Sequence, residues 1–433
     1  MFAYYLDLAT RSLKRNVALT VLMIVAIAFG VGASMTTLTV LHVLSVDPIP
    51  GKSQQLYFVQ LEPRRALGYV PGKEPLEQLT RADSEALLRA AKADRQAMMV
   101  SGSVSIEPQR PGLTPFFTEG RWTSADFFTM FRVPFIVGSA WTGEDDTRAT
   151  RVAVIARELS EKLFGTTDAV GRTIRAGGND LRIIGVIDRW RPTPHFYDLN
   201  SDIYGKGEQL FVPFETAADL KFGRSGSLDC WDESGEDPLR VGAPCVWTQF
   251  WVELDTKDKA AAYRDYLVAY SEEQRRIGNY GRPPNVRLRT VTEWLDFKGV
   301  VPDDVRLQSW IALGFLLVCL INTVGLLLTK FLRRSADIGV RRALGASKRS
   351  IFLQLLTEAG TIGLAGGVLG LALAWFGLWA VRHQPVDYAE LAQLDVSMLG
   401  ATFALAIIAS LLAGLLPAWR GCQVSPAAQL KSQ

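Results

Sequence analysis

Four stretches of this sequence contain no charged side chain over a length that could cross a lipid bilayer. Because a hydrocarbon core of about 30 Å takes roughly 20 helical residues, each stretch is long enough to span it. Buried helices of soluble proteins rarely lack charge on every face for so long. We therefore predict four transmembrane helices, containing residues 17–41, 307–329, 359–381 and 396–419.

The first stretch has a competing explanation. Lys14 and Arg15 followed by an apolar run also describe a secretory signal peptide. The run continues well beyond the apolar region of such a peptide, however, and no convincing Ala-x-Ala cleavage site follows it. We interpret it as a retained first transmembrane helix.

Basic residues near the helix ends predict the orientation, because Lys and Arg are enriched in cytoplasmic loops. They precede the first span, separate the second from the third and follow the fourth, whereas the connection between the third and fourth spans is acidic. The basic groups are Arg11, Lys14, Arg15, Lys330, Arg333, Arg334, Arg341, Arg342, Lys348, Arg349, Arg420 and Lys431, and the acidic loop carries Asp387, Glu390 and Asp395 against Arg382. We therefore expect both termini to be cytoplasmic in a bacterial inner membrane protein.

The predicted fold class is a membrane protein with an α-helical transmembrane region of four helices and a large α+β periplasmic domain. We expect transmembrane helices at 17–45, 306–329, 351–381 and 396–419, cytoplasmic segments at 1–16, 330–350 and 420–433, a periplasmic domain at 46–305 and a short periplasmic loop at 382–395.

The periplasmic segment repeats one order of elements. A strand beginning at Leu56, an amphipathic helix over 84–97 and a strand beginning at Met98 are followed much later by a strand at Thr248, a helix over 259–277 and a strand at Asn285. Two such units build a split β-α-β core from residues 46–111 and 247–300. Between them, residues 112–246 are predicted to form a β-rich insertion with strands at 151–156, 181–188 and 209–214.

Seven Lys or Arg residues gather between the second and third spans, in Lys330 and the segment 333–352. A solvated cytoplasmic loop explains these charges. It does not explain the apolar residues among them. Asp337 lies four residues before Arg341, the favourable order for a helical ion pair. Gly345 is expected to end this short helix, and Ser347 to cap the next one.

The segment "DIGVRRALGASKRSIFLQLLTEAGTIGLAGGVLGL" resembles the signature of the MacB/FtsX-type permeases of ABC transporters. Three other stretches resemble this mechanotransmission family in the same order: "LATRSLKRNVALTVLMIVAIAFGVG", "VAVIARELSEKLFGTTDAVGRTI…LRIIGVID" and "GLLPAWRGCQVSPAAQLK". Together they cover most of the chain. Asp337 departs from the pattern, since the family more often has Glu there, but the carboxylate is kept.

The resemblance implies that the short helix docks on an ATP-hydrolysing subunit. We expect Ile338, Val340 and Leu344 to insert into a groove of that partner. The residues assigned to ATPase coupling are Asp337, Ile338, Gly339, Val340, Arg341, Arg342 and Leu344.

The third span carries one carboxylate and several glycines. Glu358 near its cytoplasmic end is a functional candidate, because an intramembrane carboxylate is costly unless it is paired or hydrated. Small residues permit close approach of a neighbouring helix, either within one subunit or between two permeases. Both alternatives remain open for Gly363, Gly366, Gly367 and Gly370.

Two of the four cysteines fall in the predicted insertion. Cys230 and Cys245 lie in a loop rich in Gly, Asp and Pro, and in an oxidising periplasm they are expected to pair, although two free thiols are the alternative. We find no catalytic site and no metal site in the sequence, because the three His residues are scattered at 42, 195 and 383.

The sequence contains no Gly-x-x-x-x-Gly-Lys-Ser/Thr phosphate-binding loop, and about a dozen residues precede the first span. We therefore expect the chain not to be an enzyme and to have no cofactor of its own, with ATP and Mg bound by a separate ABC ATPase subunit. Other expected partners are the lipid bilayer, a second permease copy or paralogue, and a periplasmic membrane-fusion protein with an outer-membrane channel.

The favoured function is a permease subunit that couples cytoplasmic ATP hydrolysis to a periplasmic conformational change. This change would drive export or extraction of an antibiotic, peptide, lipid or lipoprotein. The alternative is a cell-division-type regulator of a periplasmic cell-wall hydrolase, and a membrane-tethered enzyme is a third class. Lys and Arg number 47 against 44 Asp and Glu, so no charge bias indicates a nucleic-acid partner.

Overall fold

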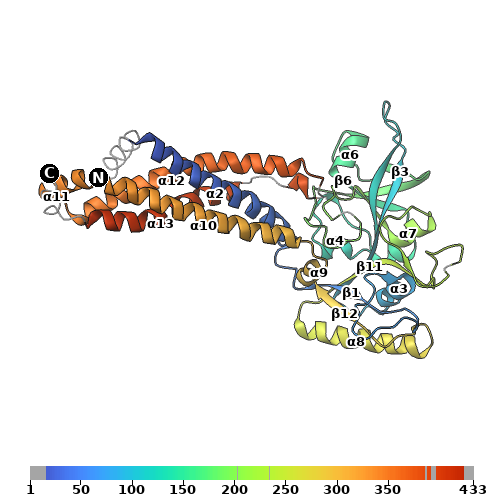
Figure 1. Ribbon diagram of the computed structural model, residues 1–433. Coiled ribbons are helices and arrows are strands. Elements are labelled where there is room, and N and C mark those ends of the chain that lie inside the picture. Colours follow the sequence, from blue (N-terminus) through green and yellow to red (C-terminus); the bar gives the residue numbers. More distant parts are fainter. Residues whose placement is uncertain (1–15, 202, 234, 386–387, 392–395, 424–433) are drawn as a thin grey trace. The chain divides into compact units, whose positions relative to one another are not determined.

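The computed structural model describes residues 16–201, 203–233, 235–385, 388–391 and 396–423 (Figure 1). The chain divides into two compact units. The helical unit consists of Met1–Val46 and Val301–Gln433, and the sheet unit of Asp47–Val300. Several residues of the orientation argument, Arg11, Lys14, Arg15, Asp387, Asp395 and Lys431, lie outside the described residues, as does the side chain of Glu390.

The described part of the helical unit contains four helices that are long and apolar enough to cross a membrane. They are α2 (Val17–Ser45), α10 (Asp303–Leu332), α12 (Lys348–Arg382) and α13 (Val396–Cys422). The four predicted apolar stretches lie within these helices. Helix α10 begins directly after Pro302, with Asp303 and Asp304 in its first turn, as expected for a helix start.

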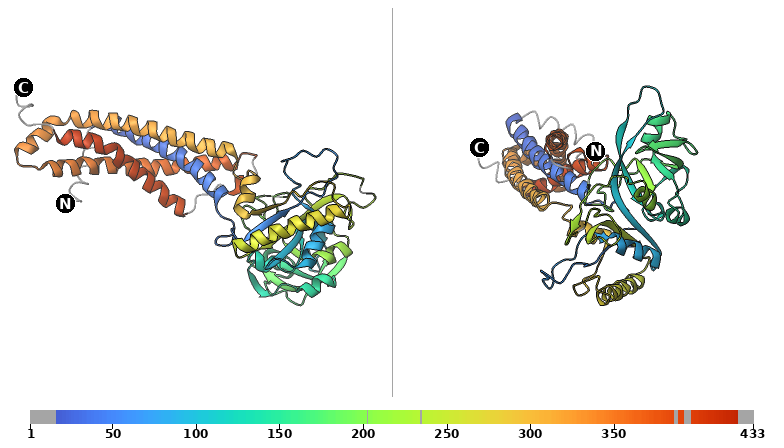
Figure 2. Two further views of the ribbon diagram at one scale, coloured as in Figure 1. Left: turned by 90° about the horizontal axis from the view of Figure 1, so that it is seen from below. Right: turned by 90° about the vertical axis from the view of Figure 1, so that its right-hand side faces the viewer.

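The four long helices pack together along their lengths (Figure 2). Helix α2 and helix α13 each lie against both α10 and α12. Met23, Ile27 and Ile362 are buried where the helices meet, whereas Phe29 and Ile321 are among many large apolar side chains that face outward. An apolar exterior of this kind matches a hydrocarbon environment, in which the helices satisfy their own backbone groups.

The sheet unit contains a twelve-stranded mixed sheet among its described residues. Its main path runs β12-β1-β11-β3-β4-β9-β6-β8-β5, while β2 and β10 pair with β11, and β7 pairs with β3 and β8. The strands are β1 (Leu56–Gln60), β2 (Leu79–Thr80), β3 (Arg95–Ile106), β4 (Phe116–Thr123), β5 (Phe135–Gly138), β6 (Val152–Ala156), β7 (Thr173–Ala176), β8 (Asn179–Ile187), β9 (Leu210–Pro213), β10 (Asp229–Cys230), β11 (Cys245–Glu253) and β12 (Arg287–Thr290).

The two predicted β-α-β units interlock in this sheet. Strand β11 lies antiparallel between β1 and β3, and β1 lies antiparallel between β11 and β12. Every residue of β11 is buried, including the polar Thr248, Gln249 and Glu253 among its apolar and aromatic residues. The helices of the unit are α3 (Arg81–Ala90), α4 (Phe127–Met130), α5 (Gly143–Thr147), α6 (Arg157–Phe164), α7 (Phe214–Asp219), α8 (Lys257–Arg276) and α9 (Val291–Phe297).

One predicted helix is misplaced. The sequence predicts a helix over 84–97, but α3 begins at Arg81 because the Thr80 side chain accepts a hydrogen bond from the Asp83 amide. It ends at Ala90, where Ala91 takes a left-handed conformation with φ +48°. The chain then enters β3 at Arg95, inside the predicted helix.

The predicted insertion is rich in strands, and its sheet is continuous with that of the core. Strands β6 and β9 lie within the predicted ranges and β8 begins two residues before its range, while β4 pairs with β3 over eight residues and with β9 in parallel. The core sheet therefore continues into the insertion, and helices α4 to α7 cover parts of it (Figure 1). Buried side chains from both regions, such as Val59 and Ile183, belong to one apolar core.

Candidate functional site: the coupling helix and its attachments

The segment that connects α10 to α12 forms a short helix, α11 (Ser335–Ala343). Gly345, with φ +98°, follows its end, a conformation that favours glycine. Ser347 then caps α12, since its hydroxyl accepts a hydrogen bond of 3.1 Å from the Ser350 amide. The predictions that Gly345 ends the short helix and that Ser347 caps the next one are confirmed.

One face of helix α11 packs against other helices of its unit, and the other face is exposed. Ile338 is only 7% exposed and Gly339 is buried, while Val340 is 61% and Leu344 is 83% exposed. The expectation that Ile338 inserts into a partner is therefore wrong, because this side chain belongs to the core that the helix ends form. Only Val340 and Leu344 of the three predicted apolar contacts are open to a partner.

Two arginines attach α11 to the neighbouring transmembrane helices. Arg341 donates a hydrogen bond of 2.8 Å to the Gln354 side chain on α12, and Arg342 donates one of 3.5 Å to the carbonyl of Cys422 on α13. Helix α11 is thus held by side chains to α12 and α13. Asp337 is exposed on α11, and its pairing with Arg341 stays a prediction.

Glu358 lies in a buried ion cluster beside α11. Its carboxylate contacts Lys330 Nζ at 2.7 Å and Arg334 Nη1 at 3.0 Å, and both the Glu358 and Lys330 side chains are at most 1% exposed. Lys330 also donates a hydrogen bond of 3.3 Å to Thr20 on α2. These side chains connect α10, α12 and α2, and two basic groups compensate the intramembrane carboxylate.

Sequence reasoning missed the role of Lys330. The sequence places this residue in a solvated basic loop, but the structure places it in the last turn of α10 with no exposure. The sequence feature that could have indicated this pairing is the isolated negative charge of Glu358 in an apolar span. Glu358 is the only charged residue in the predicted span 351–381, which indicates a compensating basic partner on another segment.

The glycines of α12 are contact points inside one chain. A Cβ built on Gly363 would lie 1.9 Å from Ser410 Oγ, and one on Gly367 would lie 2.9 Å from a side-chain atom of α13. Cβ atoms on Gly366 and Gly370 would lie 2.8 Å and 3.3 Å from atoms of α2. Of the two alternatives for these glycines, the structure therefore shows packing within one subunit.

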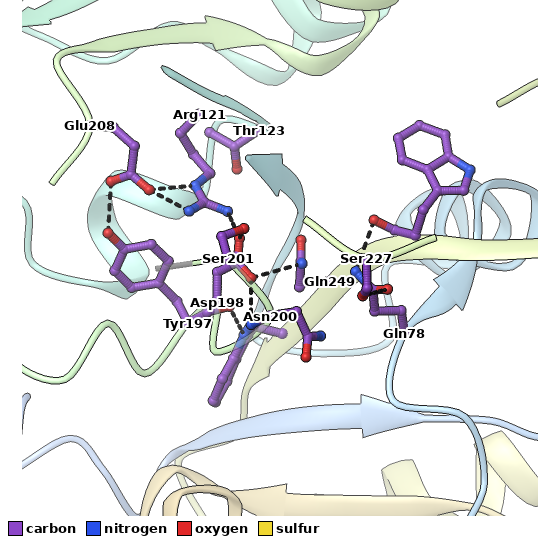
Figure 3. Close-up of polar contacts among 12 residues, drawn as sticks. Gln78, Arg121, Thr123, Tyr197, Asp198, Asn200, Ser201, Glu208, Ser227 and Gln249 are labelled. Carbon is purple, nitrogen blue, oxygen red and sulfur yellow. Dashed lines mark hydrogen bonds and ion pairs between the residues drawn. The ribbon is translucent and has the colours of Figure 1, made fainter. Parts of the chain in front are cut away.

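The sheet unit contains a second buried ion cluster, around Arg121 of β4 (Figure 3). Arg121 donates hydrogen bonds of 2.9 Å to Glu208 and 2.7 Å to Asp198. Tyr197 donates to the same Glu208 carboxylate at 2.8 Å, and Gln249 of β11 donates to Asp198 at 3.0 Å. These contacts attach the irregular segment between β8 and β9 to strands β4 and β11. None of them was predicted from the sequence.

The charges of this cluster stabilise one another. Burial disfavours the charged form of Arg121, but Glu208 and Asp198 outweigh that effect and raise its pKa. Burial likewise opposes the Glu208 carboxylate, yet Arg121 lowers its pKa below the ordinary value. Arg121 and Glu208 therefore each stabilise the charged form of the other, as in a structural ion cluster.

Cys230 and Cys245 form a disulfide bond between β10 and β11. The other two cysteines, Cys319 and Cys422, are buried and unbonded to each other. Among the residues that the structure describes, no group of three His, Cys, Asp or Glu side chains could hold a metal ion. Neither the helical nor the sheet unit thus offers a described metal centre.

Models of known protein families match the sequences of both the sheet unit and the helical unit. Residues 20–270 match the MacB-like periplasmic core domain, and residues 309–426 match the FtsX-like permease C-terminal domain. The pyoverdine export ATP-binding/permease protein PvdT of Pseudomonas aeruginosa is 22% identical over 381 residues, which cover 84% of this chain and 50% of the relative. The macrolide export ATP-binding/permease protein MacB of Azoarcus sp. is 23% identical over 431 residues, which cover 98% of this chain and 59% of the relative.

The chain spans about half the length of these curated relatives. Among solved structures, the periplasmic region of MacB from Actinobacillus actinomycetemcomitans aligns with 58% of this chain and 96% of that chain, at 11% identity and a TM-score of 0.37. The periplasmic core model alone matches more than half of the sequence, and the permease model matches most of the remainder. The chain therefore belongs to the MacB/FtsX-type family of ABC transporter permeases.

Proposed function

We propose that this chain converts ATP hydrolysis by a partner subunit into movement of the sheet unit, and so drives export or extraction of a substrate. The observation that carries the proposal is the arrangement of α11. Its Val340 and Leu344 side chains are exposed, while Arg341 and Arg342 attach it to α12 and α13. A partner that moves α11 would therefore move several helices together.

The connections between the units support this mechanism. Helix α2 ends at Ser45 and the sheet unit begins at Asp47, while the sheet unit ends at Val300 and α10 begins at Asp303. Each end of the sheet unit is thus joined to a transmembrane helix through a very short segment. The Lys330–Glu358 contact joins α10 to α12, which begins next to α11. Displacement of α11 would reach the sheet unit through α10.

Export as the outcome is favoured by the relatives, which are named as export proteins for pyoverdine and for macrolides. Their names also include an ATP-binding part, and we propose that a partner subunit supplies this part here, with its ATP and Mg. The positive-inside rule favours α11 and both termini on the cytoplasmic side. A second permease, a membrane-fusion protein and an outer-membrane channel are further proposed partners.

The test is to replace both exposed apolar residues of α11. In a reconstituted complex with the ATPase subunit, Val340→Asp/Leu344→Asp should reduce stimulation of ATP hydrolysis at least about tenfold. Two carboxylates in an apolar groove would be desolvated without partners. Hydrolysis is measured with and without the permease, and thermal unfolding of the permease is measured in parallel.

The matched control is Leu67→Asp. Leu67 is 90% exposed, like Leu344, but lies in the sheet unit, so this variant should keep full stimulation. Full stimulation by the α11 double variant would refute the coupling role of Val340 and Leu344. Loss of stimulation in both variants would indicate a general effect of the added charge and would also count against the proposal.

A further inference from the structure

A cavity of about 540 Å³ opens in the sheet unit, and its lining contains none of the Arg121 cluster residues. Its floor is formed by side chains of three adjacent strands, Val100 of β3, Trp122 of β4 and Trp247 of β11. One wall is α7 with Phe214, Ala217 and Ala218. This volume and this apolar, aromatic lining are typical of sites for small organic molecules.

The aromatic surface is preformed. Trp122 is 2%, Trp247 5% and Phe214 6% exposed. The Trp247 and Phe214 rings stack with centroids 5.8 Å apart, and Trp122 donates its indole hydrogen to the Gly223 carbonyl at 2.9 Å. These rings are almost completely covered by protein, so a ligand would touch only their edges and would lie mainly against the more exposed Phe222, Ala218 and Leu239 of the same lining.

Basic side chains add a polar preference to the same cavity. Arg81, Lys221 and Arg224 line it, and Arg81 is already occupied by Glu85 and Glu215. Neither Lys221 nor Arg224 forms an ion pair with any residue that the structure describes. Arg224 is held by backbone carbonyls of Gly226 and Ser227 instead, at 3.2 Å and 3.1 Å.

The position of Arg224 favours an anionic ligand. Partial burial lowers its pKa, because desolvation without a carboxylate partner disfavours the charged guanidinium. A bound carboxylate would remove this penalty. A guanidinium also offers five N–H donors in a planar fork, and the two carbonyls leave donors available for a second acceptor.

The rim of the cavity belongs to the loop that the disulfide closes. Glu236, Asp237 and Leu239 lie between Cys230 and Cys245 and line the cavity. The two carboxylates and Lys221 are exposed, so water screens their charges more strongly than the charge of the partly buried Arg224. The preference for an anion therefore rests mainly on Arg224.

We propose that this cavity binds an aromatic carboxylate, with the ring against Phe222, Ala218 and Leu239 and the carboxylate on Arg224 and Lys221. The proposal rests on the proposed export function to the extent that it assigns this chemistry to the cargo or to a part of it. The binding site itself is a property of the sheet unit and requires neither ATP nor the ATPase partner.

The test compares three probes that share a naphthalene ring. Binding of 1-naphthaleneacetate, 2-(1-naphthyl)ethanol and 1-naphthylmethylamine to the full chain in detergent micelles is measured by equilibrium dialysis. We expect the acetate to bind at least about tenfold more tightly than the amine, with the alcohol between them, since a charged hydrogen bond is worth roughly one factor of ten. Equal binding of acetate and amine, or tighter binding of the amine, would overturn the proposal.

Two variants locate the site. Arg224→Gln should weaken acetate binding about tenfold and alter alcohol binding less than about twofold, because only the charged contact is lost. Ala218→Trp should fill the cavity and weaken both probes. Arg240→Gln is the matched control, because Arg240 is exposed in the same disulfide loop but does not line the cavity. Unchanged acetate binding in Ala218→Trp would place the binding elsewhere and refute the site.

Partitioning of each probe into micelles is measured in protein-free detergent and subtracted, and every variant is compared in the same detergent. If Ala218→Trp fails to fold, Arg224→Gln still tests the site, because it should weaken binding of the acetate much more than binding of the alcohol. Failure of the coupling test with intact acetate binding would overturn the export mechanism and leave the site. Intact coupling without acetate binding would overturn the site and leave the export mechanism.

Discussion

At the scale of single residues, we expect the largest changes in the free energy of unfolding for substitutions in the Lys330–Glu358 pair. Both side chains are essentially inaccessible, so removal of Glu358 leaves Lys330 as a buried charge without its carboxylate, whereas removal of Lys330 leaves Glu358 with Arg334. Glu358→Leu should lower the free energy of unfolding by about 3–5 kcal/mol, and Lys330→Met should lower it by less. The double variant Lys330→Met/Glu358→Leu should cost less than the sum of the single changes, because no charge of the pair then remains unpaired.

Thermal unfolding of the four proteins in one detergent measures this double-mutant cycle. Arg333→Met is the control, because Arg333 is adjacent in sequence but exposed, and its loss should change stability by no more than about 0.5 kcal/mol. Strictly additive costs for Lys330 and Glu358 would show that the two side chains do not depend on each other.

At the scale of elements, the glycines of α12 set how closely the transmembrane helices approach. Gly363→Ala should strongly destabilise the helical unit, because its Cβ would overlap Ser410 of α13. Removing the obstructing side chain in Gly363→Ala/Ser410→Gly should restore part of the loss. We expect folded yield and melting temperature in detergent to report both effects.

The control for this prediction is Gly325→Ala on α10, where no atom lies within 4 Å of the added Cβ. This variant should be nearly neutral or slightly stabilising, since Ala favours helix more than Gly does. A Gly363→Ala variant that merely dissociates a permease dimer, with an unchanged melting temperature, would mean that this glycine serves an interface between chains instead.

At the scale of the whole molecule, the two units should be separable. The sheet unit has its own apolar core and its own disulfide, and its ends are the only places where its chain continues into the helical unit. Residues 47–300 produced alone in an oxidising compartment should therefore fold. Cooperative thermal unfolding and recovery of the Cys230–Cys245 peptide without reduction are the measurements, and a non-cooperative melt would contradict the prediction.

The candidate site was only partly predictable from the sequence. The motif around Asp337 and the glycine at 345 indicated a short helix between two spans, because capping and helix termination are local effects. The sequence did not indicate that Ile338 faces inward while Val340 faces outward. That choice depends on how α11 is rotated against the ends of its neighbours, and a nine-residue helix pattern with apolar residues on several sides is compatible with more than one rotation.

The sequence by itself determined the four transmembrane helices, because absence of charge over some 20 residues is a property of each segment alone. It likewise indicated strands β1, β3, β6, β8, β9, β11 and β12 and helix α8, because local periodicity is a property of each segment alone. Only the tertiary structure decided that Lys330 meets Glu358, that Arg121 meets Asp198 across 77 residues, and that β4 extends the core sheet through β3. Such contacts depend on the register and rotation of elements that are distant in the chain, and no local pattern encodes which charged side chains or strand edges then come together.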